Sequence, residues 1–118
     1  MNAAKNFPPA DKIELFDQLI AVHPDIERKG KTMPYTSLNG HMFSFLSKDG
    51  HMGLRLPDTE REKFLREYET ELMEQYGSIM KEYVKVPDNL LKDTDKLLEY
   101  LQMSFDYVST LKPKPTKK

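Results

Sequence analysis

Two turn dipeptides, Asn39-Gly40 and Asp49-Gly50, lie ten residues apart in the stretch LNGHMFSFLSKDGHMGLRLP. Both central residues of a type I′ β-turn need a positive φ, which Asn, Asp and Gly tolerate. Between and after these dipeptides the apolar residues recur with a period of two, which is typical of β-strands. The stretch therefore predicts three antiparallel strands in meander order, roughly at 32–38, 41–47 and 51–56.

The register of the second hairpin can be argued from its apolar side chains. A two-residue turn at Asp49-Gly50 pairs Phe45 with Leu54, and a four-residue turn over 47–50 pairs Phe45 with Met52. Both turns place the same apolar set on one face, namely Phe43, Phe45, Met52, Leu54 and Leu56. A one-residue slip pairs the phenylalanines with Gly53 and Arg55. The apolar side chains of the two strands would then lie on opposite faces, so we reject this register.

Helices are expected before and after the meander. Pro8-Pro9 opens the first, because proline fits the first helical turn, and His23-Pro24 ends it. Asp58 is a good N-cap for a second helix, and Asp93 or Thr94 caps the last. The apolar residues that line these helices have helical spacing: Ile13, Phe16 and Ile20, then Phe64, Leu65, Tyr68 and Leu72, then Leu97, Leu98, Leu101, Phe105 and Val108.

Segment 79–86 alternates and is rich in β-formers, so it predicts another strand, with a weaker partner strand around 71–76. The expected fold is α+β with two layers, in the order α-β(3)-α-β(1–2)-α. Its mainly antiparallel sheet carries the helices on one face. The chain of 118 residues suits one domain, expected at 1–111, followed by a flexible basic tail at 112–118.

Composition excludes several functions. The absence of cysteine rules out disulfides, thiolate zinc sites and a cysteine nucleophile. A net charge of −1 supplies no global basic field for nucleic acid. No apolar run approaches the roughly 18 residues that span a membrane, and the N-terminus lacks a signal-peptide core. We expect a cytoplasmic protein without a cofactor.

The sequence Gly-His-Met occurs twice, and places two of the three histidines at 41 and 51. A shared metal ion needs both imidazoles within about 2.1 Å of it. In the predicted hairpin, five residue steps separate His41 from His51, on the order of 16 Å. We therefore interpret the repeat as two similar hairpin turns, and expect no specific transition-metal site.

No catalytic motif stands out. The chain contains no GxSxG elbow, Walker loop or GxGxxG fingerprint. Acidic pairs in the second predicted helix, such as Glu60 with Glu67, are expected to form a solvated face. Tyr35, Ser44 and Arg55 converge on the outer sheet face in the predicted register, where they either bind an anion or, as we favour, stabilise the sheet.

The outer face also predicts association. With Asn39-Gly40 as a two-residue turn, Met33 opposes Leu46, Tyr35 opposes Ser44, and Ser37 opposes Met42. If the helices cover the other face, these residues form a strip open to water, which soluble monomers seldom leave uncovered. Either the last helix covers the strip or a second molecule does. The candidate partner face is Met33, Tyr35, Met42, Ser44, Leu46 and Arg55.

Three runs together resemble a known family: RKGKTMPYTSLNGHMFSFLSKDGHMGLRLP, YGSIMKEYVKVPDNLL and SFDYVSTLKPKP. The chain resembles, over about residues 10–115, the N-terminal domain of the TfoX/Sxy competence regulators. The resemblance implies a two-layer fold like that of type III secretion chaperones, often dimeric, and a stand-alone member without the helical C-terminal domain. It implies no catalytic residues.

Two functions remain open after the resemblance. The first is a non-enzymatic module that contacts protein partners, with a homodimer as one form. The second is a nucleic-acid-associated regulator of competence-type gene expression, which uses the lysine tail and Arg28, Lys29 and Lys31 as phosphate contacts. The net charge of −1 favours the first.

Overall fold

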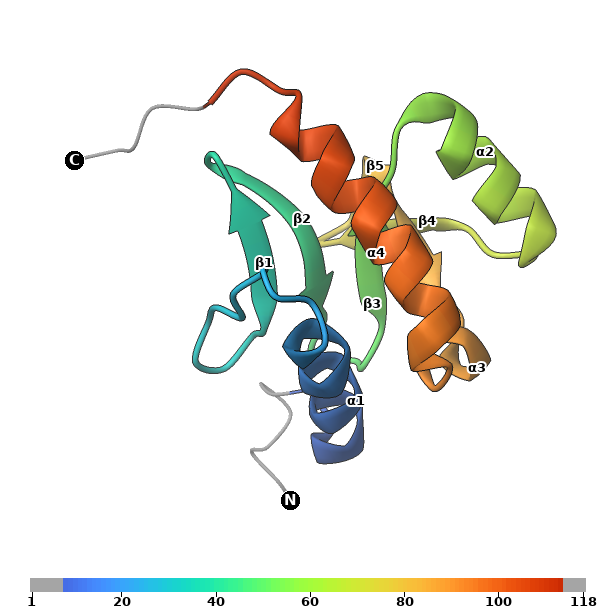
Figure 1. Ribbon diagram of the computed structural model, residues 1–118. Helices are drawn as coiled ribbons and strands as arrows, with labels where there is room; N and C mark the ends of the chain where they lie inside the picture. The colour runs from blue at the N-terminus through green and yellow to red at the C-terminus, as the bar shows by residue number, and fades with distance from the viewer. Residues whose placement is uncertain (1–7, 114–118) are drawn as a thin grey trace.

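The computed structural model describes residues 8–113, and Figure 1 shows their arrangement. The elements follow in the order α1 (Ala10–Ala21), β1 (Tyr35–Leu38), β2 (His41–Leu46), β3 (Met52–Arg55), α2 (Asp58–Glu67), β4 (Leu72–Gln75), β5 (Ser78–Val86), α3 (Asp88–Leu91) and α4 (Thr94–Ser109). The predicted α+β class is confirmed. The strand expected at 79–86 is present as β5, and its weaker partner as β4.

The five strands form one antiparallel sheet in the order β1-β2-β3-β5-β4. The helices pack on one face of this sheet, with α4 lying across it (Figure 1). The main core lies between the two layers. Its buried side chains are Phe16, Leu19, Ile20, Phe43, Leu46, Met52, Leu54, Leu56, Phe64, Val84, Val86, Leu90, Leu91, Leu97, Leu101 and Val108.

The helix starts agree with the expected signals at two of three positions. Pro9 precedes α1, and its carbonyl accepts from the backbone N–H groups of Lys12 and Ile13. Asp93 caps α4, because its Oδ1 accepts from the N–H of Lys96 at 3.3 Å. The prediction that Asp58 is an N-cap is wrong by one residue: α2 begins at Asp58.

The rejected register of the second hairpin is the one that occurs, so our prediction was wrong there. Phe45 pairs with Gly53 and Ser44 pairs with Leu54. Leu46 pairs with Met52, and the N–H of Ser47 donates to the carbonyl of His51 at 2.8 Å. Three residues, 48–50, therefore form the loop. An odd loop length shifts the pairing by one residue relative to the two-residue and four-residue turns that we considered.

The apolar face survives this shift because β2 contains a bulge at Phe43. The predicted pair Ser37–Met42 occurs beside the Asn39-Gly40 turn, and Leu38 pairs with His41. Beyond the turn the pairing shifts, so that Thr36 opposes Ser44 and Tyr35 opposes Phe45. The additional residue is Phe43. A bulge changes which face the following residues occupy, and so reorients side chains along the strand.

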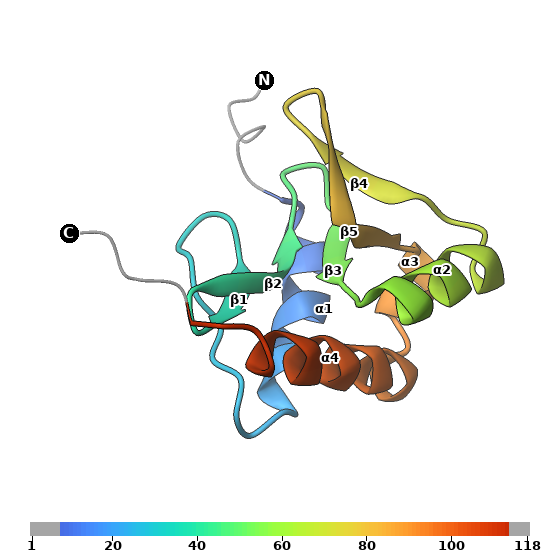
Figure 2. The ribbon, with the colours of Figure 1, turned by 90° about the horizontal axis from the view of Figure 1, so that it is seen from above.

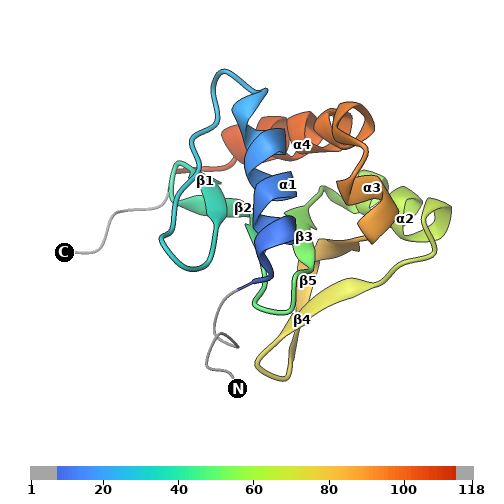
Figure 3. The ribbon, with the colours of Figure 1, turned by 90° about the horizontal axis from the view of Figure 1, so that it is seen from below.

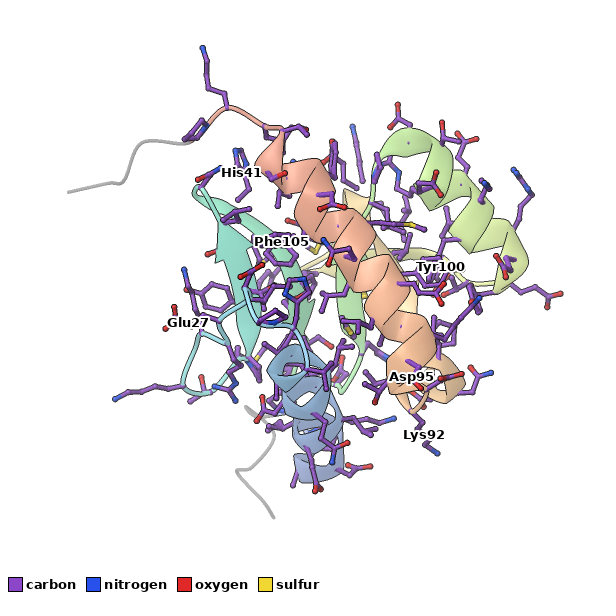
Figure 4. The ribbon with its side chains drawn as sticks, viewed as in Figure 1. Glu27, His41, Lys92, Asp95, Tyr100 and Phe105 are labelled. Carbon is purple, nitrogen blue, oxygen red and sulfur yellow. The ribbon has the colours of Figure 1, made fainter. Side chains whose placement is uncertain are left out.

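The bulge gives β2 buried side chains on both faces of the sheet. Phe43 lies on the helix side, where its ring centroid is 5.9 Å from that of Phe105. Figure 4 shows Phe105 on α4. Ser44 and Leu46 follow it into the core side, paired with Leu54 and Met52. Phe45 points to the opposite face and is only 4% exposed there. Phe45 is therefore buried on the face of the sheet that the helices leave free.

The ion pair between Lys12 and Asp88 predicts a small pH dependence of stability. Lys12 Nζ lies 2.9 Å from Asp88 Oδ1, and its hydrogen bond holds the pKa of Asp88 below the ordinary value of an aspartate. Because the folded pKa is lowered, the pair stabilises the fold above the unfolded pKa, and this stabilisation is lost as pH falls through the folded pKa. We expect a loss of at most about 1 kcal/mol, since Asp88 is exposed. Urea unfolding at several pH values should show this acid-side loss, and Asp88→Asn should remove it.

Candidate binding groove on the helix-free face

The helix-free face of the sheet has a small apolar cluster of its own. Phe45 and Met73 are buried there, at 4% and 2% exposure, although neither belongs to the core between the layers. Tyr83 packs edge-on against Phe45, with ring centroids 5.7 Å apart. The two side chains therefore belong to a second, smaller apolar cluster that lies just beneath the surface of this face.

Gly53 leaves room for the Phe45 ring beside β3. A Cβ at position 53 would lie 2.7 Å from Phe45 Cζ and 3.0 Å from Met73 Cγ, and closer still to Phe45 Cε1. Real Cβ atoms essentially never approach other atoms that closely. The missing side chain therefore allows Phe45 and Met73, from strands on either side of β3 and β5, to meet across the sheet.

A groove of about 740 Å³ lies on this face. One wall is the β2–β3 loop, and the other is the β4–β5 hairpin. Its volume falls in the range of ordinary ligand and peptide sites. The lining residues are Met33, Ser47, Lys48, Asp49, His51, Glu71, Leu72, Met73, Glu74, Gln75, Tyr76, Gly77, Ile79 and Lys85.

The charges along the groove are nearly balanced. Lys85 Nζ lies 2.9 Å from Glu71 Oε2, and the hydrogen bond and charge of Lys85 lower the pKa of Glu71. The remaining charged groups of the lining are Lys48, Asp49 and Glu74, with His51 beside the loop. A lining of two lysines and three carboxylates supplies neither the basic field that phosphates need nor a strongly acidic one.

A second polar cluster borders the face at the ends of β3 and β5. Arg55 Nε donates to Glu82 Oε1 at 2.6 Å, and its guanidinium lies 5.9 Å and 5.7 Å from the ring centroids of Tyr83 and Tyr107. The Tyr83 hydroxyl donates to the Met42 carbonyl at 2.6 Å, and burial raises the pKa of Tyr83. These groups satisfy one another, so the cluster is a structural tie between strands and α4.

The β4–β5 hairpin extends past the groove with apolar side chains at its tip. From the pair Leu72–Val84 to the pair Glu74–Ile79, β4 advances by two residues whereas β5 advances by five. The distal part of the hairpin therefore departs from the regular ladder. Figures 2 and 3 show it projecting away from α4. At the tip Tyr76 is 95% exposed, and beside it Ile79 is 55% exposed.

The candidate partner face predicted from the sequence is only partly on this surface. Ser44 and Leu46 are fully buried on the helix side, because of the bulge at Phe43, so their assignment to an outward strip is wrong. Met33 lines the groove, while Tyr35, Met42 and Arg55 are partly exposed. The trio of Tyr35, Ser44 and Arg55 does not converge, since Ser44 Oγ instead bonds Thr36 Oγ1 at 2.5 Å.

Two of the three candidate phosphate contacts are occupied within the fold. Arg28 Nε donates to Asp17 Oδ1 at 2.9 Å, and its Nη1 donates to the Gly30 carbonyl. Lys29 Nζ donates to Ser37 Oγ at 3.0 Å, whereas Lys31 is exposed. Residues 114–118 of the basic tail lie outside the described residues.

The histidines lie in three separate surroundings. His41, at the β1–β2 turn, donates from Nε2 to the Lys112 carbonyl at 2.8 Å (Figure 4). His51 lines the groove, and His23 is buried, with Nε2 2.7 Å from Gln102 Oε1. Within residues 8–113 no group of three or more His, Cys, Asp or Glu is placed to hold a metal ion. No helix in that range is long and apolar enough to cross a membrane.

Sequence reasoning did not place Tyr76, Ile79 and Met73 on a common surface. The strand pattern around 71–76 is weak, and the distal part of the hairpin departs from the regular ladder. The one available signal was the dipeptide Tyr76-Gly77, a turn that uses an aromatic residue where asparagine is usual.

No family model, curated protein or solved structure matches this chain.

Proposed function

We propose that this chain is a non-enzymatic module that binds protein partners through the helix-free face of its sheet. The observation that carries the proposal is the groove, which has an apolar floor and lies beside the exposed side chains of Tyr76 and Ile79. Exposed apolar surface next to a concavity is typical of protein interaction sites, and tyrosine is enriched among residues that dominate binding energy.

The charged groups support binding rather than catalysis. The lowered pKa values of Glu71 and Asp88 both come from ion pairs with lysines at exposed positions. Neither carboxylate is paired with a nucleophile or a second acid, which is the arrangement that acid–base chemistry requires. We therefore assign the ion pair of Asp88 to the stability of the fold and that of Glu71 to the wall of the groove.

A place in the TfoX/Sxy N-terminal-domain family, with a cytoplasmic location, is part of the same proposal. It rests on the stretches GHMFSFL, GLRLP and MKEYVKVP, which lie in β2, β3 and β5. Regulation through nucleic acid is the less favoured function, because Arg28 and Lys29 are held by Asp17, Gly30 and Ser37.

The test compares two exposed aliphatic residues on different parts of the surface. Ile79 on the hairpin is 55% exposed and Val22 after α1 is 52% exposed, so a lysine at either position should be tolerated equally by the fold. We expect Ile79→Lys to lose at least tenfold in the yield of proteins captured from native cytoplasm, and Val22→Lys to capture as the wild type does. Quantitative mass spectrometry measures both. Equal capture by the two variants would contradict the proposal.

A further inference from the structure

The ring of His23 is buried where the end of α1 meets α4. Only 7% of the residue is exposed, and its ring centroid lies 5.2 Å from that of Phe105 on α4. The connector, residues 24–34, begins at the next residue and leads to β1. A buried polar ring needs hydrogen-bond partners, so the state of its two nitrogens can be read from the groups around them.

A chain of hydrogen bonds fixes the proton on the outer nitrogen of this ring. Asp106 Oδ1 accepts from Gln102 Nε2 at 2.9 Å, because an ionised carboxylate can only accept. The amide of Gln102 therefore turns its oxygen toward His23, and Gln102 Oε1 lies 2.7 Å from His23 Nε2. An amide oxygen also only accepts, so His23 Nε2 carries a hydrogen and donates it.

The other nitrogen faces a donor that cannot change its role. The backbone N–H of Asp25 donates to His23 Nδ1 at 3.1 Å. In the neutral ring Nδ1 is an acceptor, whereas in the imidazolium both nitrogens are donors. A proton on Nδ1 would point at the Asp25 N–H, and that bond would be lost. The observed network therefore fits the neutral ring alone.

The charged groups of the elements around His23 are exposed or engaged with other partners. They are Asp17 of α1, Asp25, Glu27 and Arg28 of the connector, and Glu99 and Asp106 of α4. Within residues 8–113 none of their carboxylates forms an ion pair with the His23 ring. Exposed carboxylates are screened by water, so their attraction for an imidazolium is weak.

The bond at Asp25 fastens the first residues of the connector to the ring. Further along, Arg28 Nε donates to Asp17 Oδ1 at 2.9 Å, and the backbone of Lys29 exchanges hydrogen bonds with that of Tyr35 at 2.8 Å and 3.0 Å. These later ties do not involve a histidine. A proton on His23 would thus loosen the start of the connector while its end stays attached to β1.

We propose that His23 is a pH-sensitive switch, in which the neutral ring joins α1, the connector and α4, and a proton on Nδ1 opens this joint. Histidine in an unfolded chain gains its proton around pH 6.5. On acidification the unfolded chain then binds more protons than the folded one, so stability falls as pH falls. The inference is independent of the proposed binding function.

The size of the effect follows from the unfolded chain. One pH unit below the value for free histidine, about one unfolded chain in eleven has a neutral ring, and one unit above it nearly all do. The folding equilibrium constant should therefore be about tenfold smaller at pH 5.5 than at pH 7.5. The aspartate of the Lys12–Asp88 pair titrates below this window, so the two effects are separable.

Urea unfolding of the full chain and of two variants, at pH 7.5 and pH 5.5, tests the switch. His23→Asn keeps an acceptor for the N–H two residues on, as in an Asx-turn, and has no proton to gain. Its stability should be nearly equal at the two pH values. His41→Asn is the control and should keep the tenfold change, because His41 Nε2 donates to the Lys112 carbonyl, which both charge states of the ring allow.

Nitrogen NMR of the wild type adds a readout that needs no variant to fold. At pH 7.5 the His23 ring should carry its proton on Nε2, and the amide resonance of Asp25 should shift at the pH at which the ring gains its second proton. A ring protonated on Nδ1 at pH 7.5, or an Asp25 amide that does not respond, would overturn the switch. So would a wild type of equal stability at both pH values, or a His23→Asn variant that keeps the tenfold change.

Discussion

Replacing Phe43 by alanine should lower the free energy of unfolding by about 3–5 kcal/mol, the usual cost of emptying a core aromatic site. Phe43 is fully buried and packs edge-on against Phe105 of α4 at 5.9 Å. Its backbone carbonyl also accepts a hydrogen bond from Ser104 Oγ at 3.3 Å. The substitution removes the contact between the Phe43 ring and Phe105 of α4. Urea-induced unfolding measures the loss in the free energy of unfolding.

Val22→Lys is the matched control, because the Val22 side chain is 52% exposed and does not belong to the buried core. Its free energy of unfolding should stay within about 0.5 kcal/mol of the wild type, as is usual for surface substitutions. A Phe43→Ala variant that unfolds at the wild-type urea midpoint would show that Phe43 does not lie between β2 and α4.

Adding one methyl group at Gly53 should cost about 1–3 kcal/mol, the range for overpacking a well-filled site. The new Cβ would lie 2.7 Å from Phe45 Cζ and 3.0 Å from Met73 Cγ. In a Phe45→Ala background the same Gly53→Ala change should cost much less, since the clashing ring is gone. A double-mutant cycle by urea unfolding measures this coupling.

Gly77→Ala separates the clash from the general cost of replacing glycine. A Cβ at Gly77 meets nothing within 4 Å, and its φ of +79° makes alanine strained by the backbone alone. Its cost should therefore be independent of Phe45. An equal cost of Gly53→Ala with and without Phe45 would mean that the ring does not lie over Gly53.

The fold class was predictable because it depends on strong local signals. Asn39-Gly40 specifies a tight turn by its backbone preference, and beside that turn Ser37 pairs with Met42 as expected. Helical spacing and the proline before α1 placed the helices. These features act over a few residues, so a single sequence reveals them.

The register beyond Ser37 was not predictable, because two departures from regularity act together. The Asp49-Gly50 signal belongs to a three-residue loop, and Phe43 forms a bulge in the neighbouring ladder. Either one alone would turn the apolar side chains of β2 to the wrong face. We assumed regular strands, rejected the pairing of Phe45 with Gly53, and so placed Ser44 and Leu46 outside and Phe45 inside.

The groove was missed for the same reason. Its lining combines the β2–β3 loop with the β4–β5 hairpin, whose distal part departs from the regular ladder. Met73 and Phe45 meet only because Gly53 carries no side chain. Such contacts between separate strands depend on the tertiary arrangement, which no periodicity along the chain records.

Site-specific cross-linking tests most directly whether the hairpin tip is a binding surface. A photo-reactive phenylalanine analogue at position 76 replaces one exposed aromatic side chain by another, and the same analogue at position 22, which is 52% exposed, is the control on a different part of the surface. After irradiation in cells, position 76 should give discrete cross-linked species in high yield and position 22 almost none. A band at twice the monomer mass identifies a second copy, and any other band a different protein. No cross-links from position 76, or equal yields from both positions, would contradict binding through this face.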